Sequence, residues 1–363
     1  PELRGKDQLK WTERLDAEQD NLRVVLDHAI AKEEGDAALQ LATTLAWFWY
    51  LRGQYAEGRR WLEQAIALGS SSGSDRSVLI LRAQRCLGEL AYLQCDYETA
   101  RRQLLAGQRL ARALGLELDE ADATQALGSI ARERGDYDKA RELHSAALVV
   151  YEAQGDALKA ARAHNYLAFA AWLSGNTWQA RRDVQRAESE FARLADEEGA
   201  IWALLNVGCI ELLDQHHEEA LARINTAHQR SRTAGFKEGI AWTLNVLGWI
   251  ALEAGQLDEA KETLQESLSR HRELGDLWRA SSVTEALAAL AVGRGDPARG
   301  AQLLGIASAI RRRLGTPVPQ CEVARVEQTR DACRAALGGQ LAILHEAGAA
   351  LPLDHAIRFA LES

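Results

Sequence analysis

The residue types that most often carry out chemistry occur in this chain, but not at the spacings that chemistry needs. His216, His217, Glu218 and Glu219 are of metal-ligand types. Adjacent residues on a turn point apart, however, and no third cluster lies at the helical i, i+4 spacing that brings ligands together. We therefore interpret this segment as a solvent-exposed turn and predict no metal site.

Serine, cysteine and histidine are all present, yet no nucleophile elbow or other local catalytic motif surrounds them. His144 and His164 lie within predicted helices, at positions that packing residues usually occupy, so we interpret both as core or interface residues. The cysteines have neither an even count nor ligand spacing, which favours reduced thiols in a cytoplasmic protein. They are Cys86, Cys95, Cys209, Cys321 and Cys333. The sequence predicts no catalytic residue and no enzymatic activity.

The composition narrows the functional classes further. With 47% hydrophobic residues, 5 prolines and little strand-like alternation, the chain is predicted to be soluble and almost wholly helical. No apolar run approaches the roughly 20 residues of a membrane helix, and no signal peptide opens the chain. The formal net charge of −9 argues against direct nucleic-acid binding. The best basic cluster, Arg311-Arg312-Arg313, is interpreted as a solvated helix face.

A repeat with a step of forty residues must position any functional side chains. Small residues recur at this step, at Ala100, Ala140, Ala180, Ala220, Ala260 and Gly300. A large apolar residue followed by Gly or Ala recurs at the same step, beginning at Leu87, Leu127, Leu167, Val207, Leu247 and Leu287. Helices that approach closely need Gly or Ala at the crossing point, and a turn between antiparallel helices favours Gly. The period therefore predicts two helices per repeat, stacked into a solenoid.

These positions resemble the tetratricopeptide repeat (TPR) pattern, at Leu87-Gly88…Ala100, Leu127-Gly128…Tyr137…Ala140 and Leu247-Gly248…Ala260. The usual unit has about 34 residues, so each second helix is expected to be longer by about six. The resemblance implies an all-α fold, a right-handed TPR-like α-solenoid of about seven repeats capped by helices at both ends. The predicted bounds are 1–36 for the first cap, 37–76, 77–117, 118–157, 158–197, 198–237, 238–277 and 278–317 for the repeats, and 318–363 for the last cap. Ser70-Ser71-Ser72-Gly73-Ser74 is predicted to be a flexible loop and possible hinge.

The two ends carry a second resemblance. Gln8-Leu9-Lys10-Trp11, Arg14-Leu15-Asp16-Ala17-Glu18 and a tail that includes Asp354-His355-Ala356-Ile357 resemble the C-terminal TPR sensor region of bacterial STAND-type transcriptional regulators of the LuxR/SARP kind. The chain also contains no methionine, so we expect it to be a piece of a larger protein. The resemblance implies an NB-ARC or AAA-like ATPase module upstream.

No cofactor is expected in this chain. It has no Gly-x-x-x-x-Gly-Lys-Ser/Thr motif, and Gly5-Lys6-Asp7 lacks both the upstream Gly and the hydroxyl residue that hold phosphate and Mg²⁺. ATP or ADP is expected only in the upstream module that the resemblance implies.

In TPR arrays, positions 2, 5, 9 and 12 of each first helix line the concave groove, and this property can be transferred by position. The candidate ligand- or partner-binding residues are Trp47, Tyr50, Arg82, Arg85, Tyr92, Arg132, Arg162, Asn165, Phe169, Trp172, Trp202, Trp242, Asn245 and Trp249. The tryptophans could be ordinary packing inside a tightly curled superhelix. Alternatively, they line a binding groove in which the four arginines attract an anionic ligand or an acidic peptide.

The sequence therefore favours a sensor and protein-interaction domain of a signal-transduction ATPase. It would bind a small-molecule inducer or a protein or peptide partner, and would contact neither nucleic acid nor membrane. The alternative is a free-standing TPR scaffold that docks a peptide or protein partner. An enzyme hidden in the groove is a weaker third possibility.

Overall fold

The computed structural model describes residues 8–71 and 76–362, and within these ranges it contains 19 α-helices and no strand. The predicted helical class is therefore confirmed. Of the segments singled out above, Gly5-Lys6-Asp7 and residues 72–74 of the predicted loop lie outside the described residues. Ser70 and Ser71 belong to a helix and not to a loop.

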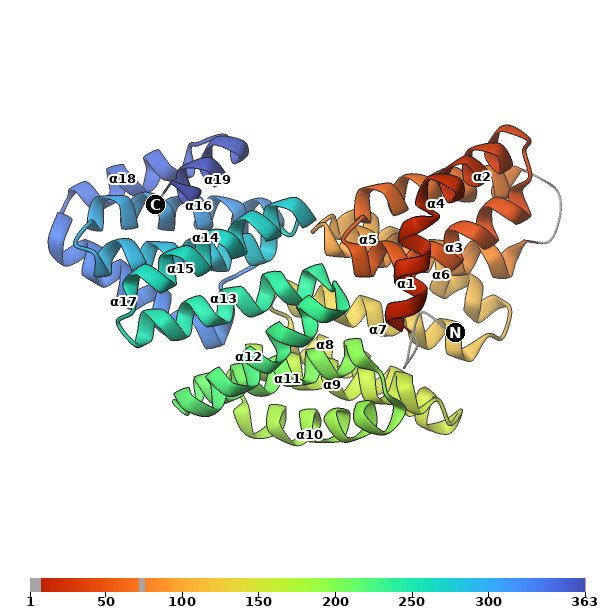
Figure 1. Cartoon of the computed structure of the whole chain (residues 1–363), viewed down its shortest axis with the longest axis horizontal. Helices are drawn as coiled ribbons and strands as arrows, with labels where there is room; N and C mark the ends of the chain where they lie inside the picture. Colours follow the sequence, from red (N-terminus) through yellow and green to blue (C-terminus); the bar gives the residue numbers. More distant parts are fainter. Residues whose placement is uncertain (1–7, 72–75, 363) are drawn as a thin grey trace.

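Fourteen of the described helices form seven consecutive antiparallel pairs, in the order that the repeat predicts (Figure 1). The pairs are α3 (Gly35–Arg52) with α4 (Tyr55–Ser71), α5 (Ser77–Leu93) with α6 (Tyr97–Ala113), α7 (Glu117–Glu133) with α8 (Tyr137–Ala153), α9 (Ala157–Leu173) with α10 (Thr177–Leu194), α11 (Glu197–Leu213) with α12 (His217–Ala234), α13 (Lys237–Glu253) with α14 (Leu257–Leu274), and α15 (Leu277–Gly293) with α16 (Pro297–Leu314). We call the first member of each pair helix A and the second helix B.

Local sequence explains where these helices begin and end. Asp296 caps α16 by accepting a hydrogen bond from the Arg299 backbone N–H, and Pro297 is the first helical residue, as the sequence predicts. Between α7 and α8 the chain turns at Gly135, whose φ of +78° suits a residue without a Cβ. Gln215 occupies the corresponding position between α11 and α12 at φ +67°, where a side chain is strained.

In four of the pairs, a glycine on helix A faces a packing residue on helix B. A Cβ at Gly248 would lie 2.4 Å from the Leu264 side chain, and one at Gly208 would lie 2.5 Å from Ile224. The helix B positions that follow at the forty-residue step are Leu104, His144, Val184, Ile224, Leu264 and Leu304, and all are buried. His144 is thus the one polar residue in an apolar series, which agrees with its interpretation as a core histidine.

Replacing His144 with leucine is expected to stabilise the protein, most of all in acid. The ring is fully buried, both ring nitrogens lack hydrogen-bond partners, and burial lowers its pKa to about 3. An unfolded histidine binds a proton near pH 6.5, so the native state loses about 1.4 kcal/mol per pH unit as the pH falls from 6.5 towards 3. Urea unfolding at pH 5 and pH 7.5 measures this effect. The gain from His144→Leu should be larger at pH 5, and an equal gain at the two pH values would contradict this account.

Two helices precede the repeats and pack on the first pair. They are α1 (Gln8–Ala17) and α2 (Gln19–Ala31). Leu26 and Ala29 of α2 are buried, and Arg23 donates two hydrogen bonds to the Glu57 carboxylate, both 2.7 Å long. These contacts cover the apolar end of the array.

Three helices follow the repeats, α17 (Gln320–Leu337), α18 (Gln340–Ala349) and α19 (Leu353–Leu361). The α16 and α18 backbones touch, because a Cβ at Gly305 would lie 1.9 Å from the His345 carbonyl oxygen. Helix α19 packs against α14 and α16, where Gln265 donates to the Leu361 carbonyl over 2.6 Å. Helix α17 packs against α16 and α15 and also reaches α9, across the inner side of the array.

The basic run Arg311-Arg312-Arg313 at the end of α16 is only partly exposed, whereas the sequence predicts a solvated helix face. Arg312 and Arg313 are exposed, but Arg311 is only 4% exposed and makes a two-pronged ion pair with Glu285, each N···O distance being 2.7 Å. Arg311 also donates to Ser282 over 3.1 Å and to the Pro317 carbonyl over 3.0 Å. The prediction was wrong for Arg311 because the apparent basic run crosses from the surface of α16 to its packed side.

The superhelix curls until its early repeats meet its late ones. In Figure 1 the helix pairs follow an arc, from α1 to α4 at one side, through α7 to α12, to α13 to α19 at the other. Tyr50 donates to Glu198 over 2.9 Å, and Arg52 donates to the Gly235 carbonyl over 3.3 Å. Within the described residues, no helix combines the length and apolar character needed to cross a bilayer.

Candidate functional site

The inner faces of the A helices enclose a cavity of about 350 Å³, which we call the central cavity. Of the fourteen residues predicted from the sequence, ten line it: Trp47, Tyr50, Arg85, Tyr92, Arg132, Arg162, Asn165, Phe169, Trp202 and Trp242. They come from α3, α5, α7, α9, α11 and α13. Six of the seven A helices therefore bring predicted residues together at one place.

Contacts between distant repeats close the central cavity. Trp202 donates through Nε1 to the Tyr50 hydroxyl over 3.1 Å, and the Arg162 guanidinium lies 4.8 Å from the Trp47 ring centroid. On another side, the Trp278 backbone N–H donates to the Cys95 sulfur over 3.3 Å. Side chains from the first two repeats thus meet the fourth, fifth and seventh, which makes the concave face a partly open cavity.

The four remaining predicted residues lie elsewhere. Arg82 is 48% exposed and pairs with Asp119 over 3.1 Å outside the lining. Trp172, Asn245 and Trp249 line a neighbouring pocket of about 20 Å³, which is closed by α17. These three residues therefore lie apart from the other predicted residues, because a helix of the same chain occupies that part of the inner face.

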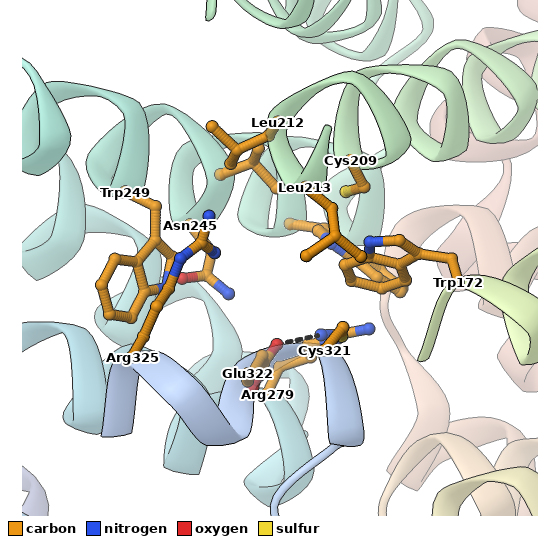
Figure 2. A pocket seen from close by; sticks show the side chains of 12 residues that line it. Trp172, Cys209, Leu212, Leu213, Asn245, Trp249, Arg279, Cys321, Glu322 and Arg325 are labelled. Carbon is orange, nitrogen blue, oxygen red and sulfur yellow. Dashed lines mark ion pairs between the residues drawn. The ribbon is translucent and has the colours of Figure 1, made fainter. Parts of the chain in front are cut away.

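Figure 2 shows how α17 covers this smaller pocket, with Glu322 and Arg325 reaching up from α17 towards Arg279, Asn245 and Trp249. Arg325 lies 5.1 Å from the Trp249 ring centroid and pairs with Glu253 over 2.8 Å. Glu322 accepts a hydrogen bond from Ser282 over 2.8 Å. The packing interpretation of the tryptophans thus fits Trp172 and Trp249, whose rings face this covered pocket.

The arginines of the central cavity are already neutralised by carboxylates. Arg85 pairs with Glu89 over 2.7 Å, and Arg132 pairs with Glu133 over 2.7 Å. The third, Arg162, approaches Glu198 to 2.7 Å and Asp196 to 3.2 Å. Because each predicted arginine has its own partner, the central cavity offers none of them as an unpaired charge for an anionic ligand.

The wall of the central cavity contains a hydrogen-bonded polar cluster and several contacts between arginines and aromatic rings. Arg132 donates to the Tyr92 hydroxyl over 2.6 Å, which donates in turn to Glu133 over 2.6 Å. The Arg132 guanidinium lies 4.0 Å from the Phe169 ring centroid. Arg279 is held between two indoles, 3.4 Å from the Trp242 centroid and 3.9 Å from that of Trp278. The wall therefore presents flat aromatic surface beside fixed polar groups, the residue types that dominate binding hot spots.

Several polar atoms in this wall are buried without a hydrogen-bond partner among the described residues. They are Thr43 Oγ1, Arg85 Nε, Gln125 Oε1, Arg132 Nη1, Glu133 Oε2, Arg162 Nε, Glu238 Oε2, Trp242 Nε1, Trp278 Nε1, and Nε and Nη2 of Arg279. Buried polar groups in folded proteins are almost always hydrogen-bonded, so a cluster of exceptions needs an explanation. A ligand that brings both donors and acceptors would satisfy them.

Sequence reasoning missed lining residues at the starts of helices, among them Glu238, Asp276, Trp278 and Arg279. They lie outside positions 2, 5, 9 and 12 of the A helices, and they face the central cavity only because the superhelix closes. One feature of the sequence could have indicated that Glu238 has a special role. At the forty-residue step, Val78, Leu118 and Leu158 are followed by Glu198 and Glu238, so acid replaces apolar residues in successive repeats.

The candidate metal and thiol residues do not form a shared site. His216 approaches Glu211 to 2.8 Å and His217 approaches Glu253 to 3.4 Å, so the two rings have different partners. In the described part of the chain, no group of three or more His, Cys, Asp or Glu residues could hold a metal ion. All five cysteines are buried thiols, and burial raises the pKa of Cys209 to about 12, far from a reactive thiolate.

Comparisons with known proteins agree with this architecture. Two family models described as tetratricopeptide repeat match the chain, one at residues 119–189 and 199–273 and the other at 39–69. No curated protein matches the sequence significantly.

Solved structures show the same fold at low sequence identity. A Rap protein complexed with competence and sporulation factor superposes with a TM-score of 0.65 at 13% identity, over 97% of this chain and 99% of that one. The Rap conjugation gene regulator of plasmid pLS20, in complex with the Phr* peptide, gives a TM-score of 0.62 at 16% identity, over 77% and 76% of the two chains. Residues 39–69, 119–189 and 199–273 are therefore tetratricopeptide repeats, and the chain folds as a TPR-like α-solenoid.

Proposed function

We propose that this chain binds a peptide, or an extended segment of a protein partner, inside the central cavity. The observation that carries this proposal is the aromatic wall of the central cavity with its unpartnered donors and acceptors. A peptide backbone alternates N–H and C=O groups, so it supplies both kinds of partner along its length. The likeness to two Rap structures, one of them in complex with the Phr* peptide, supports the same class of ligand.

Selection from a library of short random peptides displayed against the immobilised chain tests this function. Enrichment of related sequences, and their saturable binding in solution, is the expected result. A repeat protein with an unrelated inner face serves as the control for peptides that bind non-specifically. Failure to enrich any sequence beyond that control would contradict peptide binding, and thermal-shift screening of small metabolites would then test the inducer alternative.

The wider setting that we propose is the sensor region of a STAND-type regulator, in which peptide binding shifts the parent protein between resting and active states. It is supported by the sequence resemblance of the chain ends and not by the fold. The coding sequence upstream distinguishes the alternatives. A P-loop motif in the same reading frame would support the regulator, and a complete reading frame without one would support the scaffold.

A further inference from the structure

Glu238 differs from the other carboxyl groups of the central cavity. Five of the six acidic lining residues have a cationic or backbone partner: Glu89, Asp122, Glu133, Glu198 and Asp276. Among the described residues, Glu238 has no ion pair, and its Oε2 atom is buried without a hydrogen-bond partner. A buried carboxyl group without an ion-pair partner is suited to pairing with a cation that a ligand brings.

Three tyrosines interact electrostatically with this carboxyl group. Tyr50, Tyr55 and Tyr92 come from three different helices of the first two repeats, and Tyr50 and Tyr92 line the central cavity together with Glu238. Burial raises the pKa of each tyrosine well above its usual value, and the Glu238 carboxylate adds to that rise in all three. The three hydroxyls therefore lie within electrostatic reach of Glu238. Ring faces beside a carboxylate form a favourable environment for an ammonium or guanidinium group.

Resting on the proposed function, we propose that Glu238 is the recognition point for a lysine or arginine side chain of the bound peptide. The cation enters between the tyrosines and pairs with the carboxylate. This reverses the acidic-peptide preference that the sequence suggested, because the four predicted arginines are already paired or lie outside the central cavity. An acidic segment would find the predicted arginines of the central cavity already paired, whereas a basic one finds a carboxyl group that has no ion pair among the described residues.

Binding of the cation should release a proton. Burial raises the pKa of Glu238 to about 8, with Asp276 and Glu198 adding to the rise and Arg279 and Arg132 opposing it, so the empty site is mostly uncharged at pH 7. Pairing with a cation requires the ionised form. The groups that face Glu238 from the surrounding helices are Tyr50, Tyr55, Tyr92, Arg132, Glu198, Asp276 and Arg279.

The test is a parallel selection of N-acetylated random peptides on the unaltered chain, on Glu238→Gln and on Glu218→Gln, an exposed carboxyl on α12. The unaltered chain and the Glu218 variant should both enrich lysine or arginine at one fixed position. Replacing that residue with norleucine should weaken binding by about thirtyfold on the unaltered chain and hardly at all on Glu238→Gln. Near-ultraviolet circular dichroism checks that each variant is folded.

The outcomes separate this inference from the proposed function. Enriched peptides without a cationic position, or the same cationic preference on Glu238→Gln, would overturn the role of Glu238 while peptide binding stands. No enrichment on the unaltered chain would overturn both.

A pH series keeps the inference testable even if Glu238→Gln does not fold. On the unaltered chain, the association constant of the lysine peptide should rise by about fiftyfold from pH 6 to pH 8, as a one-proton linkage to a pKa of about 8 requires. The norleucine peptide should show no such rise. Equal pH dependence of the two peptides would overturn the pairing with Glu238.

Discussion

Replacing Ala126 with tryptophan is expected to weaken binding of a selected peptide by about a hundredfold or more, while the array stays folded. Ala126 is half-buried on α7 and lines the central cavity. An indole there takes up space that the peptide needs, and it removes no existing core side chain. Isothermal titration of the peptide measures the loss, and thermal unfolding checks the fold.

The matched control places the same ring outside the central cavity. Val149 lies on α8 with its side chain 65% exposed, so Val149→Trp adds an indole to the outer surface of the same repeat. This variant should bind the peptide as the unaltered chain does. Tight binding to Ala126→Trp would show that the peptide lies elsewhere.

Replacing Arg311 with methionine is expected to destabilise the protein by about 3 to 5 kcal/mol, the usual effect of removing one partner of a buried ion pair. Glu285 would remain buried on α15 without its two hydrogen bonds from the guanidinium. Burial already raises the pKa of Glu285 even with Arg311 present. Without that cation the carboxyl group should take up a proton more readily, so the loss should be smaller at pH 5 than at pH 8. Urea unfolding at the two pH values measures both effects.

Arg313 provides the control for this prediction, because it lies two residues further along α16 and is exposed. Arg313→Met should change the free energy of unfolding by no more than about 0.5 kcal/mol. Equal effects at the two positions would restore the interpretation of the basic run as a solvated face.

The helix pairs could be predicted because each repeat carries its own local signals. Gly248 packs on Leu264 and Gly135 forms a turn through short-range contacts, so a single period in the sequence reports both. The same period also places Arg311 in register with positions that prove to be buried. These are Ala111, Tyr151, Phe191, Ser231 and His271. The burial of Arg311 was therefore available from the repeat, although its charge and its basic neighbours suggested a surface.

The closure of the central cavity could not be predicted in this way. Tyr50 and Glu198 are 148 residues apart, and Cys95 and Trp278 are 183 apart. Such contacts depend on the small rotation between successive repeats, which accumulates along the array. The position of α17 is equally hidden, because it follows the point where the repeat ends. Hence the sequence could assign an inner face to the A helices. It could not show that Glu238 lines the central cavity or that α17 covers Trp249.

Photo-crosslinking with a selected peptide that carries a benzophenone side chain tests the central claim most directly. The irradiated complex is digested, and the attachment points on the chain are located by mass spectrometry. Peptide bound in the central cavity should attach to the inner faces of α5, α7 and α9, at residues such as Tyr92 and Phe169. Attachment confined to the outer surfaces of α8 and α10 would contradict the account.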